Sequence, residues 1–269
     1  MKRLLSRRSR GSAPDSAADA DPGYSNFSED ATVRRLLSGS DAPEFCVDIG
    51  ANDGRSMSNS LRLFESGWAG VAAEVDPGLF AGLAQVHESH PGVGLARFRI
   101  TPDNVATILA AFETPQDFGF LTLDIDGYDN FVLDGLLDEY RPRVICTEIN
   151  EKIPPPLRFT VLYSDDYVWD SSHFYGQSIC QLDRLCQKHE YALVELEYNN
   201  AFLMPRDLAP GSLTPEEAYR AGYADRPDRL ERMPWNRDME ELQTMAPEDA
   251  VRFLDEKFAG HRGKYQLEL

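Results

Sequence analysis

The stretch VDIGANDG at 47–54 is the most informative part of this 269-residue sequence. An apolar run, FCVDI at 45–49, leads into it, and a helical pattern follows at 58–66. Glycine allows a sharp turn and a close approach of the main chain to a ligand. The N–H groups at the start of a helix are unpaired and can bind one. We therefore interpret the stretch as a strand, a tight turn at Gly50 and Gly54, and a helix, which together form a backbone cradle.

The same alternation of strand and helix continues along the chain. Apolar strands are expected at 70–75, 95–100, 118–125 and 144–149, with helices at 78–89, 104–112, 129–139 and 177–189. Apolar strands that alternate with helices form parallel sheets covered on both faces. Two further runs at 193–197 and 201–204 flank a Tyr-Asn-Asn turn and predict a closing hairpin. The sequence thus predicts an α/β fold with a doubly wound, mostly parallel sheet.

Composition divides the chain into three parts. Residues 1–26 are rich in Ser, Ala, Asp and Arg without periodicity and predict a disordered leader. Residues 27–208 hold the sheet domain, and 209–269 predict a helical C-terminal extension without strands. The apolar side chains of this extension need burial, either over the pocket of their own domain or against a second copy of the chain. We expect an ordered extension and a homodimer.

The formal net charge of −18 argues against nucleic acid or an anionic membrane as a partner. Five basic residues at 1–10 leave room only for a short basic arm. No run of 18 apolar residues is present, so no transmembrane helix is expected. The four cysteines lie in apolar or helical segments without disulfide or zinc spacing. These features predict a cytoplasmic protein with reduced cysteines.

Glu74 follows the second expected strand, about 20 residues after the glycine loop. A carboxylate in this place can accept hydrogen bonds from both ribose hydroxyls of a nucleoside cofactor. The G-x-x-x-G spacing of the loop differs from the G-x-G-x-x-G of NAD-binding proteins. An NAD site and a domain with purely structural glycines are the alternatives.

VDIGANDG, GWAGVAAEVDP at 67–77 and LDIDGYD at 123–129 resemble the class I S-adenosylmethionine-dependent methyltransferases, most of all the FkbM-like branch. RPRVICTEIN at 141–150 extends the resemblance, which spans residues 40–205. It implies a Rossmann-like fold and S-adenosyl-L-methionine as the cofactor. The cofactor-binding residues that it implies are Asp48, Gly50, Asn52, Gly54, Glu74, Asp103 and Asn104. Asp48 and Gly50 would line the methionine part, Glu74 the ribose, and Asp103 or Asn104 the adenine.

Acidic side chains follow the fourth and fifth expected strands. Asp124, Asp126 and Asp129 come after the fourth strand, and Glu148 and Asn150 end the fifth. Oxygen ligands of this kind suit Mg²⁺ or Ca²⁺, and we predict Asp124, Glu148 and Asn150 as a tentative Mg²⁺ site. Catechol-type methyltransferases have an Asp-Asn pair where this chain has the wider Glu148-Ile149-Asn150. The alternatives are direct acid/base chemistry at Asp124, binding of a cationic substrate amine, and helix capping.

His173 lies in the polar and aromatic segment DSSHFYGQS at 170–178. Its imidazole titrates near neutrality, and the predicted roles are a catalytic base or a surface histidine. Aromatic residues at 163–175 form either a pocket wall or a loop packed on the domain.

Two functions follow from these features. The first is a methyltransferase that uses S-adenosylmethionine to methylate a small molecule, at a hydroxyl group by family resemblance. The second is a non-catalytic S-adenosylmethionine-binding or assembly module that uses the extension as its working surface. The number of polar groups expected on the acceptor side favours the enzyme.

Overall fold

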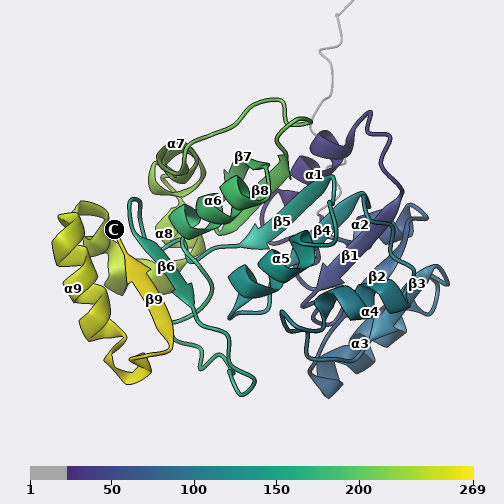
Figure 1. Cartoon of the computed structure of the whole chain (residues 1–269), viewed down its shortest axis with the longest axis horizontal. Coiled ribbons are helices and arrows are strands. Elements are labelled where there is room, and N and C mark those ends of the chain that lie inside the picture. Colours follow the sequence, from purple (N-terminus) through teal and green to yellow (C-terminus); the bar gives the residue numbers. More distant parts are fainter. Residues whose placement is uncertain (1–22) are drawn as a thin grey trace, which may run out of the picture.

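The computed structural model of this chain describes residues 23–269 (Figure 1). The basic segment 1–10 and most of the predicted leader lie outside the described residues. At 23–26, the end of the predicted leader, the Tyr24 hydroxyl donates to Glu65 over 2.8 Å. The guanidinium groups of Arg55 and Arg62 lie over the Tyr24 ring. This part of the chain is thus packed on the domain.

A seven-stranded sheet forms the centre of the described chain. Its strands are β1 Phe45–Ile49, β2 Ala69–Ala73, β3 Val93–Ala96, β4 Phe120–Leu123, β5 Val144–Glu148, β7 Tyr191–Glu197 and β8 Asn200–Pro205. Their order is β3-β2-β1-β4-β5-β8-β7 (Figure 1). Neighbouring strands are parallel except for β8, which is antiparallel to both β5 and β7. The predicted mostly parallel sheet and its closing hairpin are confirmed.

Helices cover both faces of this sheet. They are α1 Glu29–Leu37, α2 Leu61–Glu65, α3 Pro77–His87, α4 Val105–Ala111, α5 Asp129–Leu137 and α6 Ile179–Lys188. Successive strand residues point to opposite faces, so Cys46 packs with α1 and α2 while Val47 packs with α4, α5 and α6. Phe64 of α2 meets His87 of α3 edge to face, which places α3 beside α2. The fold is therefore doubly wound, as predicted.

The register of the central strands brings their carboxyl ends together. Ile49 of β1 lies opposite Ala73 of β2 and Leu123 of β4, and Leu123 lies opposite Thr147 of β5. The next residue along each strand belongs to the predicted site: Gly50, Glu74, Asp124 and Glu148. Four short, local sequence patterns thus converge on one edge of the sheet.

A second, two-stranded sheet joins the C-terminal segment to the domain. Its antiparallel strands are β6 Arg158–Val161 and β9 Tyr265–Glu268. The prediction of a purely helical extension was therefore wrong at 265–268. The four-residue run YQLE is too short to show a strand by itself, and its partner Arg158–Val161 lies far away in the sequence.

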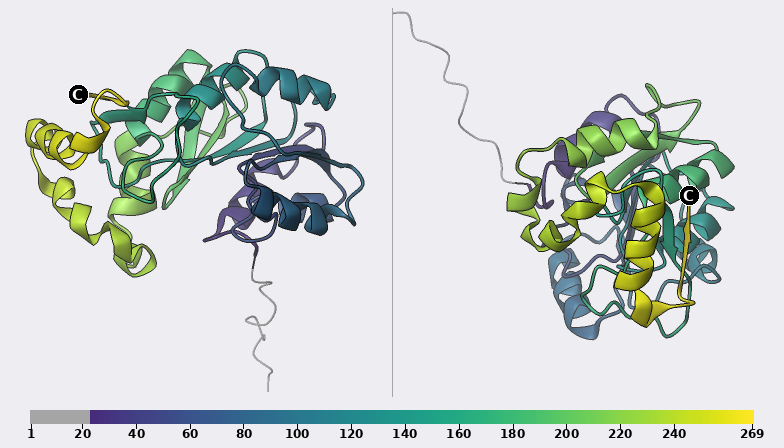
Figure 2. Two further views of the ribbon diagram at one scale, coloured as in Figure 1. Left: turned by 90° about the horizontal axis from the view of Figure 1, so that it is seen from below. Right: turned by 90° about the vertical axis from the view of Figure 1, so that its left-hand side faces the viewer.

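The rest of the extension is helical. It contains α7 Pro215–Tyr219, a π-helical turn Arg220–Ala224, α8 Arg229–Arg232, α9 Pro247–Lys257 and two 3-10 helices, Pro234–Thr244 and Ala259–His261. Thr214 and Glu217 form a capping box that begins α7. Figures 1 and 2 place the extension at the end of the molecule opposite β2 and β3.

The extension buries its apolar side chains against its own domain. Leu254 and Phe258 of the C-terminal part pack with Phe159 of β6 and Phe174 in one cluster. Tyr219 and Tyr223 belong instead to the large core beneath the sheet. Much of the apolar surface that needed a partner is therefore covered within one chain, and the homodimer stays a prediction.

We expect Leu254→Ala to lower the free energy of unfolding by about 2–5 kcal/mol, because it leaves a cavity in a fully buried cluster. Leu208→Ala is the matched control. Its side chain is 39% exposed, and the change should cost no more than about 0.5 kcal/mol. Urea denaturation of both variants measures the difference. Equal effects would mean that the extension does not share a core with the domain.

Candidate functional site

A cavity of about 790 Å³ opens at the carboxyl ends of β1, β2, β4 and β5. Ligand sites in proteins commonly measure roughly 300–1,000 Å³, and open α/β sheets bind their ligands at this edge. The cavity walls include Asp48 of β1, Gly50 and Asn52 after β1, Glu74 after β2, Asp124 and Asp126 after β4, and Glu148 of β5. The structure thus brings together most of the predicted site.

Gly50 is held against the end of β4. Its φ of +87° is strained for other residues, and a Cβ on Gly50 would lie 1.7 Å from the carbonyl oxygen of Asp124. Only glycine fits there. Gly54, with φ of +77°, packs against Leu83 of α3 and does not line the cavity. Of the two predicted loop glycines, Gly50 is therefore the one that shapes the site.

The loop after Gly50 is longer than predicted. Helix α2 begins at Leu61 and has only five residues, so the expected cradle of helical N–H groups next to Gly50 is not formed. The carboxylate of Asp53 instead accepts from the N–H groups of Arg55 and Ser56, at 2.9 and 2.7 Å, and turns the chain. Side chains that bind nearby N–H groups compete with helix formation in this way.

Glu74 closes the loop from the neighbouring strand. Its carboxylate accepts from the backbone N–H of Asn52 at 3.0 Å and from that of Asp76 at 2.7 Å. Each oxygen keeps a further lone pair toward the cavity that it lines. Both ribose hydroxyls of a nucleoside could be bound there, and the close approach of the chain at Gly50 suits the rest of S-adenosylmethionine. The residues present fit this cofactor.

Two predicted cofactor residues lie outside the cavity lining. Asn104 precedes α4, where its amide accepts from the N–H of Thr101 at 2.8 Å and donates to the carbonyl of Arg99 at 2.9 Å. Neither Asn104 nor Asp103 lines the cavity, whereas Phe98, Arg99 and Ile100 do. Asn104 thus shapes the segment after β3 that forms the wall.

Three carboxylates crowd the floor of the cavity. Oxygen atoms of Asp124, Asp126 and Glu148 all lie within 4.8 Å of one another. Loss of surrounding water, with the charges of Asp126 and Asp129, raises the pKa of Asp124. Burial and the charges of Asp124 and Asp126 raise the pKa of Glu148 well above its ordinary value. The cluster therefore favours binding of a proton or another cation.

Asp129 and Asn150 have structural roles beside this cluster. Asp129 accepts from the N–H groups of Ile125 and Gly127, both at 2.9 Å. The Asn150 amide, fully buried, donates to the carbonyls of His173 and Tyr175, both at 2.9 Å. Asn150 does not line the cavity, and Asp126 stands beside Asp124 and Glu148 where Asn150 was expected.

His173 lies on the wall of the cavity, where its Nε2 is 2.9 Å from Asp238 of the extension. Partial burial and the Lys152 ammonium lower the pKa of His173, and the Asp238 carboxylate opposes them. Of the aromatic residues at 163–175, Tyr167, Trp169 and Tyr175 line the cavity. Of the two roles predicted for residues 163–175, the structure therefore agrees with the pocket wall.

A buried polar network in the wall of the cavity was not predicted. Lys152, 2% exposed, donates to the Tyr175 hydroxyl at 2.6 Å and to Glu151 at 3.2 Å, and Tyr175 donates to Glu151 at 2.9 Å. Asn236 and Tyr219 of the extension donate to the side chain and the carbonyl of Glu151, both at 2.6 Å. Buried charges need partners of this kind. The adjacent letters EK in NEKIPPP were the available signal, but the partners lie far along the chain.

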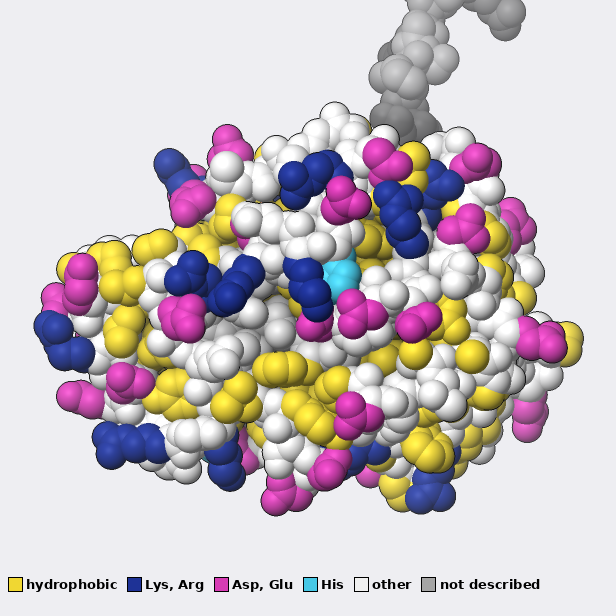
Figure 3. Space-filling model, viewed as in Figure 1, with side chains coloured by type: hydrophobic (Ala, Val, Ile, Leu, Met, Phe, Trp, Pro, Cys, Tyr) yellow, Lys and Arg dark blue, Asp and Glu magenta, His cyan; other side chains and the backbone are white. Residues whose placement is uncertain are grey.

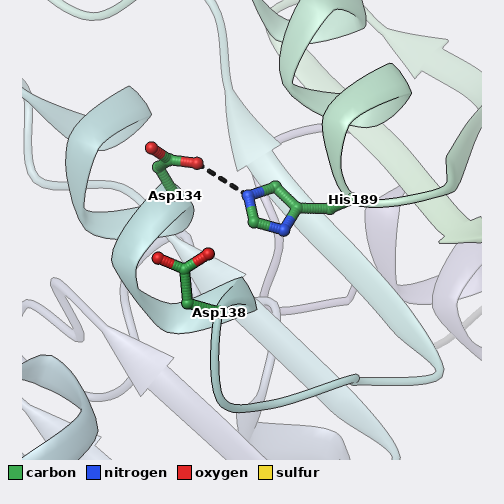
Figure 4. Close-up of side chains that lie close together, drawn as sticks. All are labelled: Asp134, Asp138 and His189. Atoms are coloured by element: carbon green, nitrogen blue, oxygen red, sulfur yellow. Dashed lines mark hydrogen bonds and ion pairs between the residues drawn. The ribbon is translucent and has the colours of Figure 1, made fainter.

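A second group of possible ligands lies away from the cavity, between α5 and the end of α6 (Figure 4). His189 Nε2 is 2.6 Å from Asp134, and the Lys188 ammonium bonds to Asp134 at 2.5 Å and lies 3.8 Å from Asp138. Lys188 already forms ion pairs with both carboxylates, so we interpret the group as a surface ion-pair network.

Comparisons with known proteins find similarity of fold at low sequence identity. No protein-family model matches the sequence, and no curated protein matches it. A protein of the NADB-Rossmann superfamily from Streptococcus agalactiae has a TM-score of 0.44 and 12% identity, over 83% of this chain and 91% of that one. Sp1610 of Streptococcus pneumoniae, a candidate tRNA (m1A22) methyltransferase, has a TM-score of 0.43 and 15% identity, over 83% and 94%.

An O-methyltransferase from Bacillus cereus, solved in complex with SAH, has a TM-score of 0.42 and 15% identity, over 71% of this chain and 82% of that one. Methyltransferases are thus among the structures similar to this chain. At such identities and scores the likeness is one of fold, and the activity has to be inferred from the chain's own side chains. Among the described helices, none is long and apolar enough to cross a membrane.

We expect Gly50→Ala to lower the free energy of unfolding by roughly 2–5 kcal/mol, because the new methyl group meets the Asp124 carbonyl at a strained φ. Gly39→Ala is the matched control, since Gly39 has φ of +74° with nothing within 4 Å of its Cβ position. Backbone strain alone costs about 1–2 kcal/mol. If both variants lost the same stability in urea, the contact with Asp124 would not constrain the loop.

Burial raises the pKa of Asp48 to about 6, although a hydrogen bond from Ser60 lowers it in part. The folded chain therefore binds a proton that the unfolded chain, near its ordinary pKa of 3.8, has released. The free energy of unfolding must then fall as pH rises from about 4 to about 6. Asp48→Asn removes this loss. The difference in free energy of unfolding between variant and parent should therefore shift by about 2–3 kcal/mol in favour of the variant from pH 4 to pH 7. Denaturation across this range measures it, with the exposed Asp117→Asn as the control for charge. A constant difference would contradict the prediction.

Proposed function

We propose that this protein is an S-adenosylmethionine-dependent methyltransferase that acts on a small molecule. The observation that carries the proposal is the pairing of Glu74 with the Gly50 loop. The Glu74 carboxylate, which is suited to a ribose, binds the loop at Asn52. The main chain of the same loop contacts the end of β4 at Gly50. The cavity continues beyond Glu74 and the Gly50 loop to Asp124, Glu148 and His173, which leaves room for an acceptor.

The class I methyltransferases, and among them the FkbM-like branch, are the family to which we assign the chain. The basis is the sequence VDIGANDG, the acidic end of GVAAEV and the LDIDGYD motif, whose residues Gly50, Glu74 and Asp124 line one cavity. We favour the enzyme over a binding module without activity because the cavity continues past the Gly50 loop to Asp124, Glu148 and His173, which leaves space for an acceptor.

S-adenosylmethionine supplies, when bound, an electrophilic methyl group. Transfer forms a bond from the acceptor atom to the methyl carbon as the bond from sulfur to that carbon breaks, so the protein's main task is to hold donor and acceptor in line. For a hydroxyl acceptor a proton must also leave. We assign it to a carboxylate oxygen of Asp124, whose pKa is raised by loss of water and by the charges of Asp126 and Asp129.

The other side chains of the site would orient the acceptor and enclose it. His173 faces Asp238 through Nε2, so only its Nδ1 is left for an acceptor. Tyr167 fixes the wall, because its hydroxyl donates to the carbonyls of Asp126 at 3.1 Å and Phe174 at 3.0 Å. Magnesium has no assigned part in these steps, because Asn150, one of its three predicted ligands, does not line the cavity.

The charge distribution on the surface also favours a small acceptor over nucleic acid. On the face drawn in Figure 3, Lys and Arg side chains are interspersed with Asp and Glu rather than gathered into one basic area. Proteins that bind nucleic acid usually carry such an area. A cytoplasmic location remains a prediction from the sequence.

The cofactor assignment is tested by titration calorimetry with S-adenosylmethionine. Glu74→Ala should weaken binding by about 1.5–3 kcal/mol, or roughly 10- to 150-fold, because hydrogen bonds to a charged group are lost. Glu88→Ala, an exposed glutamate at the end of α3, should bind like the parent. Circular dichroism checks that the Glu74 variant is folded. Unchanged affinity in a folded variant would refute the ribose assignment.

Transfer itself is tested with S-adenosylmethionine labelled in the methyl group, incubated with the full-length protein and a filtered small-molecule extract. Label should appear in a small molecule with the parent protein and not with Asp124→Asn. Tight cofactor binding with no transfer to any fraction would favour the binding module.

A further inference from the structure

The floor of the cavity holds acceptor atoms that have no donor. Among the described cavity-lining residues, three have a buried oxygen without a hydrogen-bond partner: Asn59 Oδ1, Glu148 Oε2 and Asn199 Oδ1. Glu148 is only 8% exposed, and its other oxygen accepts from the Asn199 amide at 2.7 Å. Buried polar groups in folded proteins are nearly always paired. Glu148 Oε2 is therefore open to a hydrogen-bond donor from a ligand.

The charges around the floor point to the same kind of partner. Seven acidic residues line the cavity in the described chain: Glu29, Asp48, Glu74, Asp124, Asp126, Glu148 and Glu151. The basic lining residues are Arg99, which donates to the carbonyl of Tyr167, and Lys152, which is bound to Glu151 and Tyr175. No described ion pair includes Asp124, Asp126 or Glu148. Three carboxylates with oxygens within 4.8 Å of one another thus lack a protein cation.

The mouth of the cavity is apolar, in contrast to its floor. Nine large hydrophobic side chains of the described chain are exposed, and seven of them line this one cavity: Met57, Val75, Leu79, Phe98, Val168, Trp169 and Trp235. Val75, Leu79 and Phe98 follow β2 and β3, on the side of Glu74. Exposed apolar side chains gathered at one place mark a binding surface.

Val168, Trp169 and Trp235 belong to the acceptor side instead. Val168 and Trp169 lie in the segment after β6, and Trp235 comes from the extension. Their exposed fractions are 73%, 37% and 58%. Trp235 lines the cavity, and no hydrogen bond or ring contact is found for it in the described chain. A flat, apolar group of a ligand suits this part of the mouth.

We propose that the acceptor is an organic cation, a protonated amine that carries an apolar or aromatic group. Its ammonium donates to Glu148 Oε2 between Asp124 and Asp126, and its apolar part lies at the mouth against Trp169 and Trp235. This names the substrate class for the proposed methyl transfer and rests on that function. The ammonium anchors the molecule, and the methylated atom is a separate group of the same molecule that reaches the cofactor.

A divalent metal ion satisfies only half of these observations. It would neutralise the carboxylates, but a metal ion with its water ligands gives the tryptophan side chains nothing to contact. A neutral or anionic acceptor would bring no positive charge to the carboxylates. An amine with an apolar group meets both the donor requirement of the floor and the apolar mouth.

The proposal is tested with three probes of equal size and different charge: phenethylamine, 2-phenylethanol and phenylacetate. Each is titrated into the full-length protein saturated with S-adenosylhomocysteine, so that no transfer occurs. Saturation with this product is itself measured first, and its failure would count against the proposed function rather than the amine site. We expect the amine to bind at least about tenfold more tightly than the alcohol, and the carboxylate most weakly.

Two variants assign the parts of the site. Glu148→Gln keeps the shape but removes the charge, and should abolish the preference for the amine over the alcohol. Trp235→Ala should weaken the amine and the alcohol by the same factor and leave the preference in place. Asp134→Asn, in the balanced cluster of Figure 4, is the control for loss of an acidic residue and should bind all probes like the parent.

Three results would overturn the proposal. The first is equal binding of amine and alcohol, or no binding of the amine at millimolar concentration in protein that binds S-adenosylhomocysteine. The second is a preference for the amine that persists in Glu148→Gln. The third is binding of Mg²⁺ alone that depends on Glu148 and excludes the amine, which would make the cluster a metal site.

Discussion

The loop after β1 crosses the carbonyl oxygen of Asp124 so closely that no side chain fits between them, and the rest of the site depends on this contact. A Cβ on Gly50 would lie 1.7 Å from that oxygen. Backbone hydrogen bonds hold the arrangement from both sides. Gly50 and Ala51 donate to the carbonyl of Ala73, at 3.0 and 2.9 Å, and Asp124 donates to that of Ile49 at 3.0 Å. Three strand ends are thereby joined before any ligand binds, so Glu74 and Asp124 occupy fixed positions.

This convergence has an electrostatic consequence. Parallel strands end at the same edge of the sheet, so an acidic residue after each strand gives a group of carboxylates in one place. Burial raises the pKa of Asp48 to about 6, and burial with neighbouring charges raises that of Glu148 well above its ordinary value. Because these carboxylates are harder to ionise in the folded chain, the free energy of folding is less favourable at neutral pH. A cationic ligand recovers part of that loss on binding, and S-adenosylmethionine, with its sulfonium and ammonium groups, is itself such a ligand.

The features that the sequence could predict are the local ones. FCVDI, its glycine turn and the acid after the next strand are short-range patterns, and the structure confirms the strand and places Gly50 and Glu74 at the cavity. The strand at 265–268 was missed because its register is set by β6, far away in the chain. Glu151 and Lys152 were missed for the same reason. A charged pair in a sequence looks solvated until Tyr175 and Asn236 are known to surround it. Asn104, in contrast, was expected near the cofactor and instead organises the turn before α4.

The part of the cavity proposed for the cofactor, at Gly50 and Glu74, and the part proposed for the acceptor, at Trp169 and Trp235, differ in how they are built. The cofactor half comes from consecutive strand-loop units, whose geometry follows from the twist and register of one sheet. The acceptor half combines the segment after β6 with the extension, and Glu151 connects the two through its side chain and its carbonyl. Because Trp235 and Asp238 lie in the extension, the shape and polarity of the acceptor side depend on the C-terminal segment. Changes in that segment can alter the acceptor without disturbing the Gly50 contact, since the two are built on separate elements. On the function proposed above, the fold in this way separates the binding of the methyl donor from the choice of acceptor.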